Sequence, residues 1–141
     1  MNVKVTFDGK NFADDLTKKL EAECEQAIKM IAMKIEADAK ELCPVDTGRL
    51  RDSIDSVFSS SNGNWTAEIG TDVEYAYYIE YGTGKYNPDG RKDPWVYQSA
   101  DGSWHFTEGM KAQPFLYPAF NQNRKFIEQY LRDRISKVLG G

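Results

Sequence analysis

Apolar residues change their spacing along this chain, and the changes divide it into elements. Residues 3–7 alternate between apolar and polar types, which predicts a short β-strand closed by Asp8-Gly9. From Asn11 to Leu42 the apolar positions recur every three or four residues, and most charged residues lie between them. This spacing predicts one long amphipathic helix of about eight turns, which Pro44 ends.

Short alternating segments fill the middle of the chain. A helical turn at 50–53 is followed by two predicted strands, 54–60 and 65–70, and Asn62-Gly63 between them suits a hairpin turn. The segment 75–81, Tyr-Ala-Tyr-Tyr-Ile-Glu-Tyr, fits both the strand period and the helix period. We favour a third strand there.

The region 84–109 is rich in glycine and proline and contains a second predicted hairpin. Its strands, Trp95–Gln98 and Trp104–Thr107, flank a turn with Asp101-Gly102 at the tip. The region is too long for a simple connector, so we expect it to be a mobile loop. Its tryptophans are either core residues or anchors for a partner.

A final helix is predicted from Pro118, because proline is common in a first helical turn, and Gly140-Gly141 ends it. Together the elements predict an α+β fold in one domain, residues 1–141. The N-terminal and C-terminal helices are expected on one face of a mainly antiparallel sheet of about four or five strands, with an extra aromatic hairpin loop.

Charge is distributed unevenly. The net charge of −4 disfavours a protein that binds nucleic acid without regard to sequence, which needs a basic face. Residues 60–83 carry acidic side chains and no Lys or Arg, whereas residues 114–141 are mainly basic. The two regions either meet, within the fold or across copies, or form two solvated faces. The apolar runs are too short for a membrane span, and the N-terminus lacks an apolar signal region.

The two cysteines indicate no disulfide. On one helix, a rise of about 1.5 Å per residue separates Cys24 from Cys43 by roughly 28 Å, too far for a bond. Reduced, buried thiols are therefore expected. With no CxxC and a single histidine, His105, the sequence predicts no metal and no cofactor.

Three strings are the most informative part of the sequence. String 1 is Cys-Pro-Val-Asp-Thr-Gly-Arg-Leu-Arg at 43–51, string 2 is Tyr-Ala-Tyr-Tyr-Ile-Glu-Tyr-Gly-Thr-Gly at 75–84, and string 3 is Gln-Pro-Phe-Leu-Tyr-Pro-Ala-Phe at 113–120. The candidate motif residues in them are Pro44, Asp46, Thr47, Gly48, Arg49, Leu50, Tyr75, Ala76, Glu80, Gly82, Thr83, Pro114, Phe115, Leu116, Pro118 and Ala119.

String 1 contains Asp46-Thr47-Gly48, which matches the Asp-Thr-Gly of aspartic proteases. In those enzymes two carboxylates share a proton, so one copy here would require a homodimer. The structural alternative is more direct. Pro44 ends the helix, Asp46 accepts backbone hydrogen bonds as a cap for the turn before Leu50, and Gly48 takes a positive φ.

String 2 offers two further chemical features. Gly82-Thr83-Gly84 is not followed by the lysine and hydroxyl of a phosphate-binding loop. Glu80 lies among tyrosines, and a salt bridge or a cap on backbone N–H groups explains it better than catalysis.

In this order, the strings resemble the small neck and tail-completion proteins of long-tailed bacteriophages, the family typified by the gene-ten product of a lambdoid phage. The resemblance runs from about Leu16 to Leu139, and the matching positions are 44–51, 75–83 and 114–119. The region 84–109 corresponds to the family's variable segment, so its hairpin inherits no role. Host, prophage origin and the tier of the neck stay open.

The resemblance implies a non-enzymatic virion protein of a phage or prophage, assembled in the host bacterial cytoplasm. It would form or join a ring at the head–tail junction or tail end, with a channel for DNA. Partners would be copies of itself and other head-completion and tail proteins. A host or mobile-element module that binds a protein through its aromatic hairpin is a third alternative. The candidate subunit or partner contacts are Glu68, Asp72, Glu74, Trp95, Trp104, Arg124, Arg132 and Arg134.

Overall fold

The computed structural model describes residues 1–8, 18–61 and 63–140. Outside this part lie four predicted features: the turn residue Gly9, the helix start from Asn11, Asn62 of the hairpin turn and the final Gly141. In chain order the elements are β1 (Asn2–Asp8), α1 (Lys18–Leu42), α2 (Arg49–Ser53), β2 (Asp55–Ser61), β3 (Asn64–Gly70), α3 (Ala76–Tyr81), the 3-10 helix η2 (Gly84–Tyr86), β4 (Trp95–Gln98), β5 (Trp104–Thr107), α4 (Leu116–Gln122) and α5 (Arg124–Leu139).

The main sheet is antiparallel, with strand order β1-β3-β2. We call this sheet and the helices packed against it the body. In its central strand the side chains of Trp65, Ala67 and Ile69 are buried, whereas Thr66 and Glu68 are only half-buried. Successive side chains of a strand point to opposite faces, so β3 presents one apolar face to the core. The alternation in the sequence predicted this face correctly.

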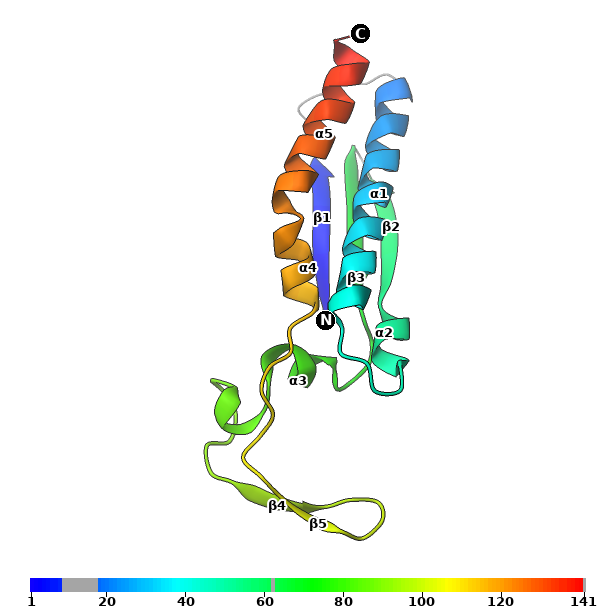
Figure 1. Ribbon diagram of the computed structural model, residues 1–141. Helices are drawn as coiled ribbons and strands as arrows, with labels where there is room; N and C mark the ends of the chain where they lie inside the picture. The colour runs from blue at the N-terminus through cyan, green and yellow to red at the C-terminus, as the bar shows by residue number, and fades with distance from the viewer. Residues whose placement is uncertain (9–17, 62, 141) are drawn as a thin grey trace.

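The helices α1, α4 and α5 cover one face of that sheet, as Figure 1 shows. In α1, the side chains of Ile28, Ile31 and Ile35 recur at helical spacing and are fully buried. Each contributes about 1.5–3 kcal/mol relative to an exposed position. The predicted amphipathic helix is thus confirmed for its described part, and so is the α+β fold.

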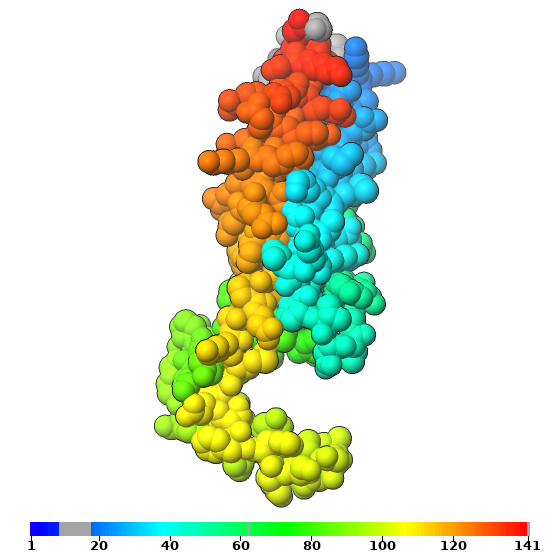
Figure 2. Space-filling model, viewed as in Figure 1, coloured from blue at the N-terminus to red at the C-terminus, as the bar shows by residue number. Residues whose placement is uncertain are grey.

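The strands form two sheets. The expected main sheet of about four or five strands has three, and the expected extra hairpin, β4 and β5, forms a separate two-stranded sheet. We call residues 95–107 the arm, because this hairpin projects from the end of the body opposite the C-terminus (Figure 1). In Figure 2 the arm and the body enclose a hollow.

The predicted strand at 75–81 is wrong, because this segment forms the helix α3. Ala76 and Glu80, four residues apart, are both buried, while Tyr77 and Tyr78 lie outside. A strand would instead bury alternate residues. Gly82 ends the helix with a φ of +81° and donates its N–H to the Tyr78 carbonyl oxygen at 2.8 Å. The sequence of this segment fits both periods. The helix is the conformation that buries the Glu80 carboxylate beside backbone N–H groups that can donate to it.

The predicted C-terminal helix consists of two helices that meet at Asn123. The Asn123 side chain is buried and donates to the Ala119 carbonyl oxygen at 2.6 Å and to Asp38 Oδ2 at 2.8 Å. These bonds fix the junction of α4 and α5 against α1. The sequence did not indicate this break, since asparagine alone does not stop a helix.

Both cysteines are buried free thiols, as the sequence predicted. Burial raises the pKa of the Cys24 thiol and that of the Cys43 thiol. Both therefore stay protonated at neutral pH and contribute to the core as small apolar groups.

Candidate functional site

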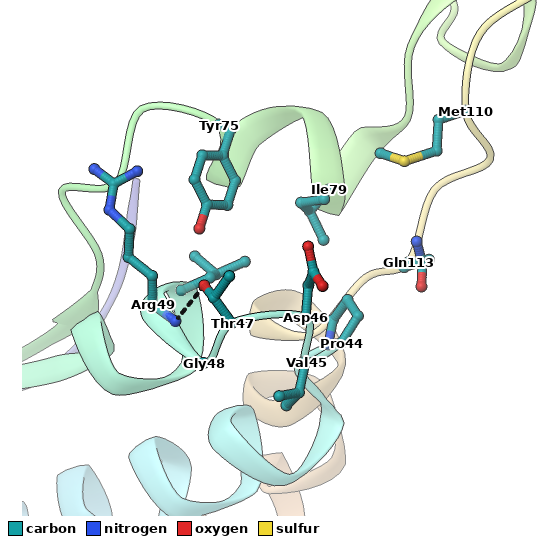
Figure 3. A pocket seen from close by; sticks show the side chains of 11 residues that line it. Pro44, Val45, Asp46, Thr47, Gly48, Arg49, Tyr75, Ile79, Met110 and Gln113 are labelled. Atoms are coloured by element: carbon teal, nitrogen blue, oxygen red, sulfur yellow. Dashed lines mark hydrogen bonds between the residues drawn. The ribbon is translucent and has the colours of Figure 1, made fainter. Parts of the chain in front are cut away.

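The three strings meet around one pocket at the end of the body that carries the arm (Figures 1 and 3). Its volume is about 550 Å³. String 1 lines it with residues 44–50, string 2 with Tyr75 and Ile79, and string 3 with Gln113. Met110 completes the wall. Segments far apart in the sequence therefore form one site, which we call the string pocket.

String 1 forms the turn between α1 and α2. The Cys43 N–H still donates to the Ala39 carbonyl oxygen at 2.9 Å, and Pro44 then ends the helical pattern. Gly48 has a φ of +87°, the left-handed conformation predicted for it. With this turn, α2 begins at Arg49 and the buried Leu50 is held against the core.

The predicted capping role of Asp46 is wrong. Thr47 Oγ1 accepts the Arg49 N–H at 3.3 Å instead, and within the described residues the Asp46 carboxylate accepts no hydrogen bond. Thr47 lies two positions before the donor, the usual spacing for a hydroxyl that closes such a turn. Figure 3 shows the Asp46 carboxylate pointing across the pocket toward Ile79.

An ion pair joins string 1 to the start of string 2. Arg49 donates from Nη1 to Glu74 Oε1 at 3.2 Å and from Nη2 to Oε2 at 3.1 Å. The guanidinium also lies 5.4 Å from the ring centroid of Tyr75. The hydrogen bonds from Arg49 lower the pKa of the Glu74 carboxyl. This pair is exposed, so its main effect is to orient the two segments.

Glu80 joins string 2 to string 3. Its Oε1 accepts the backbone N–H of Phe115 at 3.2 Å and that of Leu116 at 2.8 Å. The side chain is buried, and its Oε2 has no partner among the described residues. The interpretation of Glu80 as a cap on backbone N–H groups is confirmed.

The Glu80 contact also explains where α4 begins. The sequence predicted a start at Pro118, but the helix begins at Leu116, so Pro118 is its third residue. Proline in a first turn leaves no hydrogen bond unmade, since that N–H has no partner inside the helix. The buried Phe115 and Ala119 then pack into the core on either side of the proline.

Gly82 and Thr83 hold the chain that returns from the arm. A Cβ on Gly82 would lie 2.9 Å from the Met110 carbonyl oxygen, so only glycine fits this close approach. Thr83 donates its N–H to Met110 O at 2.9 Å, and its Oγ1 accepts the Met110 N–H at 2.8 Å. Gln113 N–H donates to Ile79 O at 2.8 Å.

Sequence reasoning missed two residues of this region. Met110 lines the pocket, and the buried Asn87 donates from Nδ2 to the Gly82 carbonyl oxygen at 3.0 Å. Met110 stands outside every periodic segment, so no sequence signal marked it. Asn87 precedes Pro88, which indicated a turn but not a contact with string 2.

Most of the candidate charged contacts have partners within the chain. Glu68 pairs with Lys4 at 2.9 Å, and Arg134 pairs with Glu23 at 3.0 Å. Arg124 lies 5.4 Å from the Phe120 ring centroid. Among the described residues, no ion pair joins the acidic region 60–83 to the basic C-terminal helix. Asp72 and Arg132 are exposed.

The candidate tryptophans are not core residues. Trp104 is 68% exposed and Trp95 is half-buried, with the Arg91 guanidinium 5.7 Å from its ring centroid. Trp65 is the tryptophan in the core, where its ring centroid lies 5.7 Å from that of Phe7. The aromatic hairpin therefore presents Trp104 to its surroundings.

The string pocket holds one carboxylate, that of Asp46. Its other polar side chains are those of Thr47, Tyr75, Gln113 and Arg49, and the Arg49 side chain is already paired with Glu74. In the part of the chain that the structure describes, no group of three His, Cys, Asp or Glu residues is placed to hold a metal ion. Over the same residues, no helix is both long and apolar enough to cross a membrane.

Comparison with protein families gives one finding. Residues 9–82, just over half of the 141, match a family model described as "Bacteriophage HK97-gp10, putative tail-component". The matched range contains string 1 and most of string 2, and it ends before the arm. Neither the curated proteins nor the solved structures give a match.

Proposed function

Because the chain belongs to the HK97-gp10-like family of bacteriophage tail components, we propose that it is a non-enzymatic structural protein of a tailed phage or prophage particle. It forms or joins a ring at the head–tail junction or at the tail end, and the ring leaves a channel for DNA. It is a virion protein that assembles in the host bacterial cytoplasm with other head-completion and tail proteins.

One observation carries the non-enzymatic part of this proposal: the strings act through structural contacts. Thr47 closes a turn, Arg49 pairs with Glu74, and Glu80 caps a helix. An aspartic protease would need a second carboxylate close to Asp46; the wall of this pocket holds none besides Asp46, so the protease alternative still requires a homodimer. The strings thus build a docking surface.

A closed ring needs two different surfaces on each subunit, since the contact repeats head to tail. Glu68, Glu74 and Arg134 already form ion pairs within the chain, so they are less available to pair with a neighbouring subunit. Asp72 and Arg132 are exposed and so remain candidates for contacts between subunits. Alternatively, acidic residues of the 60–83 region face the channel, where they repel DNA phosphates during ejection.

A second candidate function has one observation in its favour. The 68% exposure of Trp104 suits a host or mobile-element module that engages a protein partner through the arm. Such a module would act in the cell and would be absent from particles.

The proposal is tested by disrupting the gene in the phage or prophage that encodes it and examining the lysate by electron microscopy. We expect separate heads and tails, or tails of irregular length, and no infectious particles. Complementation with the wild-type gene should restore joined particles. Normal infectious particles from the disrupted phage would overturn the proposal, and a peptidase activity of the purified chain that Asp46→Asn abolishes would favour the protease.

A further inference from the structure

The arm presents an apolar face that nothing within the described chain covers. In the register of β4 and β5, Val96 lies opposite Phe106 and Gln98 lies opposite Trp104. Paired residues, and residues two positions apart, share one face of a hairpin. Val96, Trp104 and Phe106 are therefore neighbours, at 61%, 68% and 70% exposure. An exposed apolar cluster of this kind marks an interaction surface.

Side-chain hydrogen bonds hold the tip of the arm in one conformation in this structure, which contains no partner. Gln98 Nε2 donates to the Gly102 carbonyl oxygen at 2.9 Å, and Ser103 N–H donates to Asp101 Oδ1 at 2.9 Å. On the opposite face, Tyr97 and His105 stack with ring centroids 5.1 Å apart. A preorganised surface loses little conformational entropy on binding, which favours affinity.

The base of the arm is clamped to the body. Lys85 N–H donates to the Glu108 carbonyl oxygen at 3.1 Å, and the Lys85 Nζ pairs with Glu108 Oε2 at 2.6 Å. Beside this pair, Thr83 and Met110 exchange the two hydrogen bonds described above. The clamp fixes the direction in which the arm leaves the body, with the hollow of Figure 2 between them.

The string pocket has the chemistry that an aromatic anchor requires. Val45, Ile79 and Met110 supply apolar walls, and about 550 Å³ is ample for one indole ring with room at its edges. The Asp46 carboxylate faces this space without a hydrogen-bond partner among the described residues (Figure 3). In a largely apolar pocket, a small number of well-placed polar groups fix the orientation of the ligand.

Trp104 has the complementary chemistry. Its indole offers a large apolar ring and one N–H, which can donate but cannot accept. In the structure this N–H has no partner among the described residues, and the ring is 68% exposed. We propose that Trp104, on the arm of one subunit, inserts into the string pocket of a second copy of this chain and donates its indole N–H to Asp46.

The partner is a second copy because in this structure Trp104 stays 68% exposed and does not line its own pocket. Met110, on the pocket wall, belongs to the clamp at the base of the arm, and Trp104 lies at the far end of β5. The extended strand alone carries Trp104 about 10 Å away from Thr107, in a direction that the clamp fixes. The arm and the pocket are different surfaces of one chain, so their contact is head to tail and can close a ring. This inference rests on the proposed function.

Disulfide trapping between two tagged chains tests the contact. One chain carries Trp104→Cys and the other Asp46→Cys, both with Cys24 and Cys43 left in place because they are buried. After coexpression and mild oxidation, we expect a covalent pair that contains both tags. Val57→Cys is the matched control, since Val57 is 65% exposed and lies outside the string pocket, and it should give no such pair with Asp46→Cys.

Affinity measurements test the anchor separately. Self-association by analytical ultracentrifugation should weaken at least about 30-fold in Trp104→Ala, as expected for an aromatic hot spot. Trp104→Phe keeps an aromatic side chain but loses the donor and part of the apolar area, and it should weaken self-association by about 10-fold. In Asp46→Ala chains the step from Trp104 to phenylalanine should cost less, because only the loss of ring area remains. Circular dichroism melts should match the wild type, since both side chains are exposed.

The outcomes separate the inference from the proposed function. A covalent bond within a doubly substituted single chain would show that the arm closes on its own pocket and would overturn the inference. Rings that form while the Trp104→Cys and Asp46→Cys chains give no covalent pair would also overturn the inference, although the proposed function would then stand. If no pair forms and the gene proves dispensable for particle assembly, both fail.

Discussion

Glu80 connects α3 to the start of α4, and its replacement is the sharpest test of how the strings are joined. The wild-type carboxylate accepts the Phe115 N–H at 3.2 Å and the Leu116 N–H at 2.8 Å. Hydrogen bonds to a charged group contribute about 1.5–3 kcal/mol each. The unpartnered Oε2 is buried and offsets part of this gain, because burying polar atoms without partners is costly.

From these contributions, Glu80→Ala should lower the free energy of unfolding by about 3 kcal/mol, since two buried N–H groups lose their acceptor. Glu80→Gln keeps an acceptor at the same place but loses the charge, so its cost should be about 1–2 kcal/mol. The loss should be seen in urea unfolding followed by circular dichroism, with an unchanged slope.

The matched control is Glu68→Ala, which removes a half-buried surface carboxylate that pairs with Lys4 at 2.9 Å and accepts from Asn2 Nδ2 at 3.0 Å. Such surface pairs contribute at most about 1 kcal/mol, so this variant should unfold close to the wild type. If Glu80→Ala lowers the free energy of unfolding no more than Glu68→Ala does, the Glu80 hydrogen bonds do not stabilise the junction of α3 and α4. If Glu80→Gln costs as much as Glu80→Ala, the acceptor oxygen is not what stabilises it.

Two further variants test other contacts. Burial raises the pKa of Asp38, but hydrogen bonds from Asn123 and Lys34 outweigh it and lower that pKa below 3.8. Its stabilisation is thus complete above pH 3.8 and is lost as the pH falls through the lower folded value. Urea titrations should therefore show that Asp38→Asn is less stable than the wild type near neutral pH and that the gap narrows in acid; a constant gap would contradict this. Gly48→Ala should cost about 1–2 kcal/mol through its φ of +87°, measured by thermal melting, and an unchanged melt would exclude strain as the reason for glycine there.

Local patterns predicted most of the elements. Strands β4 and β5 have the bounds that the sequence indicated, because an Asp-Gly turn fixes both the register and the ends of a hairpin. The interior of α1 followed from its apolar spacing. The segment 75–81 was assigned wrongly, since its period is ambiguous and the burial of Glu80 beside α4 decides it.

The candidate site depended on contacts that local patterns do not encode. Glu80 and Leu116 are 36 residues apart, and the residues around each of them give no signal that the two are in contact. For the same reason the start of α4 was misplaced at Pro118. In string 1 the sequence correctly predicted a side-chain oxygen that accepts a backbone N–H, but it assigned this role to Asp46. Thr47 Oγ1 is the oxygen that accepts the Arg49 N–H.

The corrected positions change how the strings are interpreted. Asp46 was first considered as a catalytic residue or a cap, and the structure leaves its carboxylate free at the wall of the string pocket. The arm was expected to be a mobile loop without an inherited role, and its mobility stays a prediction. In the structure hydrogen bonds join residues of its tip, and an ion pair lies at its base.

We propose that this chain is a ring-forming subunit of a phage particle, and cryo-electron microscopy of purified particles is the decisive measurement. We expect a closed ring of this chain at the head–tail junction or the tail end, with a channel along the axis. Infectious particles that contain no copy of the chain, or that contain it outside any closed ring, would contradict it.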